Sequence, residues 1–155
     1  MTLDQIKTDL HKTQSAFLDI LDCADNTTLY QRNGDEWTLA EVLVHMAEAR
    51  TFYAHAIAQL HANPGITIGR DLTHAGRTQT IVERGGDSSA EIRAQLITSY
   101  NHMNATLNQM QDSALSTIIG NHEKWGEHTL GEFIGRYFIG HDKLHVNQAM
   151  AHLIN

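Results

Sequence analysis

Two histidines, His141 and His145, are four residues apart in the segment H-D-K-L-H, the spacing at which two side chains meet on one helix face. Neutral imidazoles at this spacing can bind one divalent metal ion, which is the geometric basis of the HExxH motif of metalloproteases. The segment has the spacing of that motif but lacks its glutamate, so a metalloprotease is not indicated. The chemistry that this pair favours is metal binding with a further ligand from elsewhere in the chain.

The candidate for the third ligand is His45, which lies among apolar residues in the segment V-L-V-H-M-A-E-A. On a helix it falls about 80° from the centre of the apolar stripe, at the edge that faces a neighbouring helix. A histidine alone on an apolar face is more often a hydrogen-bonded core residue, and this alternative applies to His45 taken by itself. Together, the three residues predict a metal site with the ligands His45, His141 and His145.

The remaining histidines are expected to lie outside this site. Most of them fall on polar stretches, in loops, on the polar side of a helix or at a helix end: His11, His55, His61, His74, His102, His122 and His128. His152 shares the face of His141 but lies more than a turn beyond His145, and its role stays open.

The helix that carries the pair places it on the core side. Stepping by about 100° per residue from Glu132 puts His141 at the middle of one apolar face and His145 about 40° to its side. Asp142 falls about 100° from His141, which indicates the surface. Since an unpartnered buried imidazole costs on the order of 1–3 kcal/mol, histidines on a core face need a shared partner or a cavity. The apolar residues of this face are Ile134, Tyr137, Phe138, Leu144 and Ala149.

Four capping boxes, in which a Ser or Thr is followed three residues later by Glu or Gln, head four amphipathic segments. These boxes are Thr2/Gln5, Thr38/Glu41, Ser88/Glu91 and Thr129/Glu132. They predict four helices, near 3–23, 38–61, 88–111 and 129–153. The long connection at 62–87 is expected to contain a short helix between Leu72 and Val82. A connection of this length is typical of a lid or a crossover. The sequence therefore predicts an all-α protein, a four-helix bundle in a single domain, 1–155.

Composition excludes several classes of function. The 155 residues carry a formal net charge of -7 and no stripe of Lys or Arg, so nucleic acid is not an expected partner. The single cysteine, Cys23, cannot form an internal disulfide, and the first residues lack the layout of a signal peptide. No apolar run approaches the roughly 20 residues that span a bilayer, so we expect a cytoplasmic protein without a membrane partner. A chain of this length folds without a metal, so a bound metal is expected to be functional.

Two segments resemble the DinB-like (YfiT-like) superfamily of four-helix-bundle metalloenzymes. The segment G-D-E-W-T-L-A-E-V-L-V-H-M-A-E-A (34–49) is similar to the start of the second helix of that family, with Trp37 ahead of a ligand histidine. The segment T-L-G-E-F-I-G-R-Y-F-I-G-H-D-K-L-H-V-N-Q (129–148) is similar to its fourth helix. The resemblance implies a metal triad of His45, His141 and His145 that binds zinc, nickel or iron, a bundle of up-down-down-up type and a homodimer. Some relatives use a low-molecular-weight thiol, among them bacillithiol transferases and mycothiol-dependent maleylpyruvate isomerases.

Two functions remain open from the sequence. The first is an enzyme in which a three-histidine divalent metal site activates a thiol, as an S-transferase, or water, as a hydrolase, on a small-molecule substrate. The second is a non-catalytic, metal-dependent small-molecule-binding or stress-response protein. Asp142 and Gln148 are candidates for contacts beside the ligands. An apolar strip of Ile139, Val146 and Met150, opposite the histidines by the same stepping, supports the homodimer.

Overall fold

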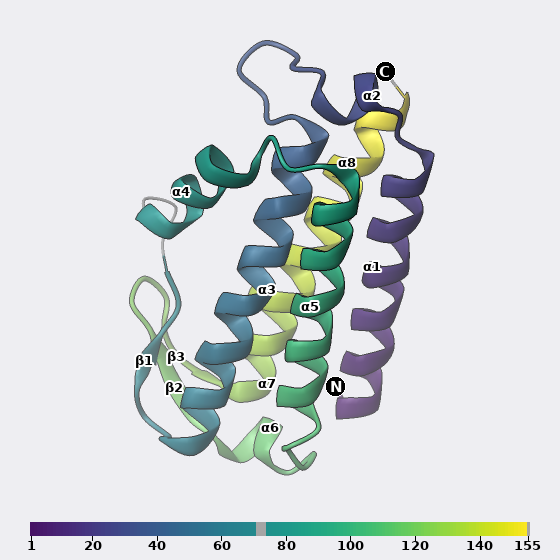
Figure 1. Ribbon diagram of the computed structural model, residues 1–155. Helices are drawn as coiled ribbons and strands as arrows, with labels where there is room; N and C mark the ends of the chain where they lie inside the picture. The colour runs from purple at the N-terminus through teal and green to yellow at the C-terminus, as the bar shows by residue number, and fades with distance from the viewer. Residues whose placement is uncertain (71–73, 155) are drawn as a thin grey trace.

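The computed structural model describes residues 1–70 and 74–154 and shows four long helices packed side by side (Figure 1). Three of them are α1 (Leu3–Cys23), α3 (Leu39–Ala62) and α5 (Ser89–Leu107), and the fourth ends in α8 (Gly140–Ile154). All four predicted capping boxes form, each with both reciprocal hydrogen bonds. The predicted all-α four-helix bundle is confirmed, and within the described ranges no helix is long and apolar enough to cross a membrane.

Helices α1 and α8 run in one direction, and α3 and α5 run in the other (Figure 1). Neighbouring pairs in the bundle are α1 with α5, α5 with α3, α3 with α8 and α8 with α1. Because α3 and α5 are parallel, the chain between them must return along the whole bundle, roughly 30 Å for helices of this length. The long connection is therefore a crossover. It carries α4 (Ala75–Arg84), which matches the short helix expected there, although Leu72 lies outside the described residues.

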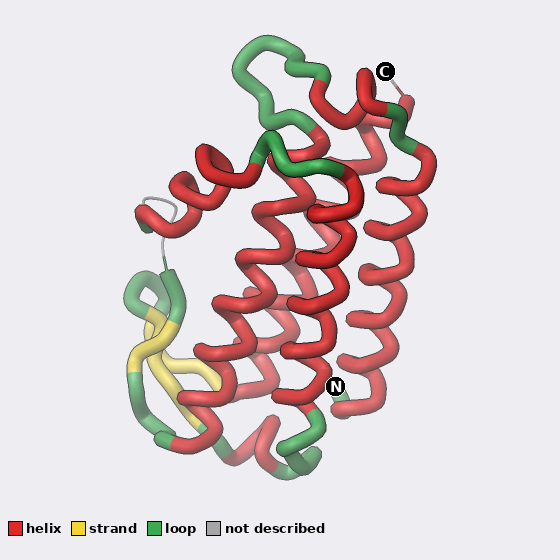
Figure 2. Tube along the Cα trace, viewed as in Figure 1, coloured by secondary structure: helices red, strands yellow, loops and turns green. Residues whose placement is uncertain are grey.

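A small three-stranded sheet at one end of the bundle was not expected (Figure 2). Strand β1 (Thr67–Ile68) pairs in parallel with β2 (Ile119–His122), which pairs antiparallel with β3 (Gly126–Thr129). The turn between β2 and β3 closes at Gly126, whose φ of 77° is a conformation that glycine adopts without a steric penalty. Two short helices, α2 (Asn26–Tyr30) and α6 (Ala114–Thr117), complete the connections.

The fourth helix is not uniform. It begins as α7 (Leu130–Glu132), continues as a π-helix, η1 (Phe133–Ile139), and becomes α-helical again at Gly140. A π turn holds one more residue than an α turn, so stepping at 100° per residue misplaces everything beyond η1 by about a quarter of a turn. Leu144, predicted in the core, is 62% exposed, and Ile139, predicted on the outer strip, is 3% exposed.

The core consists of two apolar clusters separated by a polar layer. One cluster gathers Leu10, Ile57 and Phe138 with their neighbours, and the other gathers Phe17, Leu43 and Leu96 with theirs. Between them lie the buried side chains of Thr13, Gln14, Ser99, Arg50 and Asp142. The ligand-bearing parts of α3 and α8 therefore border a hydrogen-bonded layer.

Candidate metal centre

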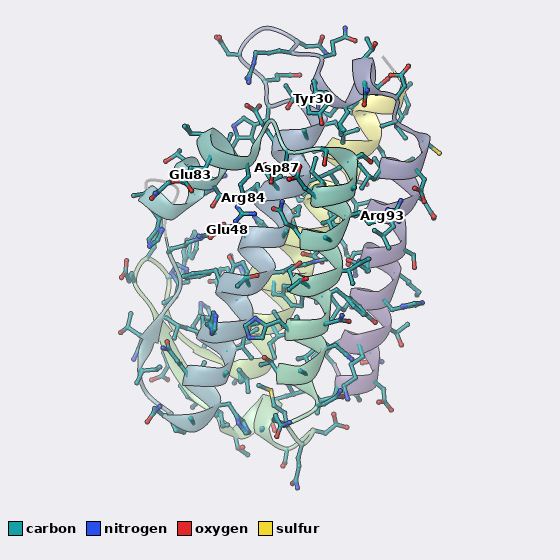
Figure 3. The ribbon with its side chains drawn as sticks, in the orientation of Figure 1. Tyr30, Glu48, Glu83, Arg84, Asp87 and Arg93 are labelled. Atoms are coloured by element: carbon teal, nitrogen blue, oxygen red, sulfur yellow. The ribbon has the colours of Figure 1, made fainter. Side chains whose placement is uncertain are left out.

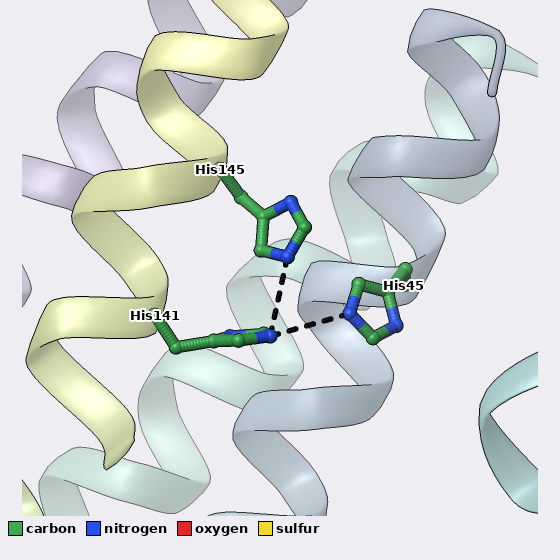
Figure 4. Close-up of side chains that lie close together, drawn as sticks. All are labelled: His45, His141 and His145. Carbon is green, nitrogen blue, oxygen red and sulfur yellow. Dashed lines mark hydrogen bonds between the residues drawn. The ribbon is translucent and has the colours of Figure 1, made fainter. Parts of the chain in front are cut away.

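The structure brings the three predicted histidines together (Figure 4). His45 comes from α3, and His141 and His145 come from successive turns of α8. The Nε2 atom of His141 lies 3.4 Å from Nε2 of His45 and 3.2 Å from Nε2 of His145. His45 and His145 are buried and His141 is half-buried, so the three ring nitrogens converge on one partly enclosed point.

Burial keeps these imidazoles neutral. Desolvation is the main cause that lowers the pKa of His45 to about 2 and that of His141 to about 3, and the neighbouring imidazoles add to it. Desolvation also lowers the pKa of His145. A metal ligand must be a neutral imidazole, and this environment supplies that state at neutral pH. The residues present therefore fit a divalent transition-metal ion in donor type, number and protonation.

Two neighbours orient His145. Gln148 Oε1 lies 2.6 Å from Nδ1 of His145, so it accepts the ring N–H and leaves Nε2, as the unprotonated nitrogen, directed at the other two rings. The indole of Trp37 stacks on His145 at 6.3 Å between ring centroids and meets His45 edge-on at 5.0 Å. Gln148, a candidate from the sequence, thus contacts one of the three predicted ligands directly.

Asp142 is not on the surface, which corrects the prediction from helical stepping. Its side chain is buried, and its Oδ2 accepts hydrogen bonds from Nε and Nη2 of Arg50 at 3.0 and 2.7 Å. Thr13 donates to the same oxygen at 2.8 Å, and Arg50 also donates to Gln14. The residue between the two α8 ligands therefore joins α8 to α3 and α1.

His122 is also not a surface residue, contrary to the prediction. It is buried on β2, where its ring stacks on Tyr137 at 4.8 Å between centroids. His128, also expected on the surface, is half-buried and lies 3.1 Å from the Tyr137 hydroxyl through its Nε2. Both errors have one cause, since these histidines belong to the sheet that the sequence analysis missed.

The other histidines lie outside the triad, as predicted. His11, His55 and His74 are exposed, whereas the positions of His61, His102 and His152 are half-buried. His152, whose role was open, lines a separate cavity with His145.

Two cavities adjoin the triad. One, of about 550 Å³, is lined by all three histidines together with Arg70, Arg77 and Arg136 and aromatic residues of the sheet and η1. The other, of about 440 Å³, is lined by Trp37, His145, Gln148 and His152 and by acidic residues ahead of α3. Both are within the range of small-molecule sites. His145 and Arg77 border both cavities.

Sequence reasoning missed the arginines and Trp125, which shape the larger cavity. Arg70 and Arg77 lie in the crossover, Arg136 on η1 and Trp125 at the β2–β3 turn. The alternation and the turn glycine in I-G-N-H-E-K-W-G-E-H-T are the signal that could have revealed this hairpin.

Comparisons with known proteins agree with this architecture. The chain is similar to YfiT from Bacillus subtilis, described as a probable metal-dependent hydrolase with an unusual four-helix bundle topology. The TM-score is 0.80 at 14% identity, over 97% of this chain and 85% of that one. It is also similar to mycothiol-dependent maleylpyruvate isomerase, with a TM-score of 0.71 at 12% identity, over 99% of this chain and 60% of that one. At such identities, structural similarity shows a shared fold.

No protein of curated function matches the chain significantly. A family model described as the DinB superfamily matches residues 9–149, which include all three histidines of the triad. This match covers most of the sequence and agrees with the resemblance of the two histidine-bearing segments. The chain therefore belongs to the DinB superfamily.

Proposed function

We propose that this protein is a metal-dependent enzyme in which His45, His141 and His145 hold one divalent transition-metal ion, zinc, nickel or iron. The observation that carries the proposal is the convergence of three neutral imidazole nitrogens at the wall of a cavity of about 550 Å³. Three histidine ligands are typical of catalytic sites, because they leave coordination positions open, whereas structural zinc sites are closed by four protein ligands.

A divalent ion held there would lower the pKa of a bound thiol or water toward neutrality and so supply a nucleophile. Residues of the chain itself position the imidazoles. Gln148 fixes the tautomer of His145, and the indole of Trp37 lies parallel to that ring, with 6.3 Å between the centroids. The two cavities that meet at His145 favour a reaction between two small molecules, as in thiol S-transfer.

The similar proteins lend further support. One is described as a metal-dependent hydrolase and the other as an isomerase that depends on mycothiol, a low-molecular-weight thiol. Hydrolysis by activated water is therefore the second candidate reaction. The non-catalytic alternative, a metal-dependent small-molecule-binding or stress-response protein, uses the same site without turnover.

Metal analysis tests the site. Protein purified without an affinity tag is expected to hold about one transition-metal ion per chain, and His45→Ala, His141→Ala and His145→Ala are each expected to lose it. His55→Ala is the matched control, because this exposed histidine is on the same helix as His45. Wild-type metal content in all three triad variants would disprove the site. A chelator is expected to remove the metal without unfolding the chain.

Steady-state rates with several thiols and one soft electrophile test turnover. We expect wild-type protein to exceed the rate of free thiol in buffer and His145→Ala to fall to that rate. If no thiol supports turnover while an ester or amide is hydrolysed, water is the nucleophile. If neither reaction occurs although the metal is bound, the non-catalytic alternative is correct.

We also propose that the protein is cytoplasmic, which rests on its single cysteine, and that it is a homodimer, which rests on the resemblance to the family. The predicted apolar strip of Ile139, Val146 and Met150 is not exposed as a continuous surface and does not support the homodimer. Ile139 is buried within its own chain, and Val146 packs on the core. Only Met150 of the three is exposed. Light scattering at tens of micromolar is expected to give twice the mass of one chain, and a monomer would refute the proposal. Ile139→Asp is expected to destabilise the fold rather than separate two subunits.

A further inference from the structure

We propose that the cavity of about 550 Å³ beside the triad binds a small molecule with an oxyanion, such as a carboxylate, on a planar conjugated body. The oxyanion would lie against Arg136 and His122, and the planar part against Trp125 and Tyr137. This inference rests on the proposed function, since it names the substrate class of that site.

The charge of the cavity is the first observation. Three arginines, two from the crossover and one from η1, line it, and its described lining includes no Asp or Glu, although the whole chain has a net charge of -7. Glu48 balances Arg70 through a two-pronged ion pair. Arg136 forms no ion pair in the described part of the chain, and its guanidinium lies over the Tyr137 ring, 5.6 Å from the centroid. A ligand anion would therefore meet a guanidinium that is not paired with a carboxylate. A guanidinium binds a carboxylate or phosphate through two parallel hydrogen bonds.

The tautomer of His122 is the second observation. Its Nδ1 accepts a hydrogen bond from the backbone N–H of Lys124 at 3.1 Å, so a neutral ring must carry its proton on Nε2. Burial lowers the pKa of this imidazole, which keeps it neutral. Gly69 passes so close that a Cβ there would lie 2.5 Å from Nε2. Only glycine therefore fits beside this ring. His122 lines the cavity, and in the proposal its Nε2–H is the donor to the anion.

The aromatic wall is the third observation. The rings of Trp125 and Tyr137 are nearly parallel, 14° apart, with centroids separated by 5.2 Å, and His122 stacks on Tyr137 at 29°. Trp125 is 47% exposed although it lies in this stack, so part of its surface remains free. Flat rings with a free surface favour a flat ligand, because stacking then adds to burial of apolar area. The triad forms another part of the same wall, where a reactive carbon of such a ligand would meet the nucleophile.

Calorimetric titration with three probes tests each half of the proposal. The probes are cinnamate, which is planar and anionic, cinnamamide, which is planar and neutral, and cyclohexanecarboxylate, which is anionic and not planar. We expect metal-loaded protein to bind cinnamate about tenfold more tightly than either of the others, which is the effect of one charge-assisted contact or one stacked ring. Equal affinity for cinnamate and cinnamamide would overturn the role of the anion.

Variants assign the contacts. Arg136→Gln is expected to weaken cinnamate about tenfold and leave cinnamamide unchanged, whereas Trp125→Ala weakens both planar probes and leaves cyclohexanecarboxylate unchanged. Arg93→Gln is the charge-matched control, since Arg93 on α5 pairs with Asp22 on α1, remote from the sheet (Figure 3). Thermal unfolding confirms that each variant is folded. Unchanged cinnamate affinity in Arg136→Gln would overturn the proposal.

Repeating the titration after chelation separates this proposal from the metal site. Cinnamate binding that is lost with the metal and is unchanged in Arg136→Gln would mean that the carboxylate only ligates the ion. This result would overturn the anion subsite and support the metal site. Binding that persists without metal and remains sensitive to Arg136→Gln supports the subsite. The same result in a protein that never takes up metal would leave the subsite standing and refute the proposed function.

Discussion

The hydrogen bond between Gln148 and His145 decides which nitrogen of that imidazole faces the other two rings. Replacing Gln148 by Leu removes the acceptor, so the ring can rotate or change tautomer. We expect metal affinity to fall about 10- to 100-fold, as for other partners of ligating histidines, with little change in folding. Competition with a chromogenic chelator measures this affinity.

The control for this substitution is Asn147→Leu. Asn147 is the preceding residue of α8 and is exposed, so the same change of polarity occurs without loss of a contact to the triad. Equal metal affinity in Gln148→Leu and Asn147→Leu would show that Gln148 does not position the ligand.

The buried imidazoles also make the metal-free protein sensitive to acid. Burial lowers the pKa of His45 to about 2 and that of His141 to about 3, whereas an imidazole in the unfolded chain has a pKa near 6.5. Because the folded-state pKa is the lower one, the unfolded chain binds more protons below pH ~6.5. Their contribution to stability is complete above this pH and is lost as the pH falls toward the folded-state values.

Urea unfolding in the presence of a chelator measures this effect. Between pH ~7 and pH ~5.5, we expect the free energy of unfolding to fall by about 1 kcal/mol for each of these two histidines. Carboxylates with lowered pKa values, such as Asp25 and Glu132, act at lower pH, outside this window. His45→Gln should reduce the dependence of the free energy of unfolding on pH. A free energy of unfolding that does not change over this pH range would contradict the burial of His45 and His141 as neutral imidazoles.

At the scale of elements, the pair formed by Arg50 and Asp142 fixes α8 against α3. Both side chains are fully buried, and Asp142 lies between the two α8 ligands. Asp142→Leu leaves the Arg50 charge buried without its counter-ion, which is expected to cost about 3–5 kcal/mol. The double variant Arg50→Met/Asp142→Leu removes both charges and should recover most of this loss. Denaturant unfolding of the three proteins measures the difference.

Lys143→Met is the control for the pair. Lys143, next to Asp142, forms an ion pair with Asp9, and both side chains of this pair are solvent-accessible. Such exposed pairs contribute about 1 kcal/mol or less to the free energy of unfolding. If Asp142→Leu cost no more than Lys143→Met, the buried pair would not stabilise the contact between the two ligand-bearing helices.

The sequence predicts the helices and the triad because the signals for both are local. A capping box spans four residues, and the i,i+4 pair needs only that α8 is helical. Asp142 was misplaced because the angle calculation assumes uniform α-helix, and η1 precedes it. Nothing near Arg50 in the sequence identifies Asp142 as its partner, since that pairing depends on how α3 and α8 pack.

At the scale of the whole molecule, the sheet and its histidine escaped prediction for a related reason. Strand β1 has two residues, and its partner β2 follows more than fifty residues later. Neither periodicity nor turn chemistry connects them. His122 and Trp125 therefore reach the cavity only through the tertiary fold, and the larger part of the cavity wall could not be inferred from the sequence.

The order of the helices has a consequence for how the proposed metal site assembles. His45 and His141 are 96 residues apart, and His141 and His145 both lie on α8, far from α3 in the sequence. Until α8 packs against α3, the single imidazole of α3 and the pair on α8 are apart, and the set of three imidazoles does not exist. Uptake of an ion at the proposed site would therefore report that α3 and α8 have packed together. A bound ion would link α3 to α8, two helices that are far apart in the sequence. It would therefore oppose the gain in conformational entropy of the intervening chain when the two helices separate.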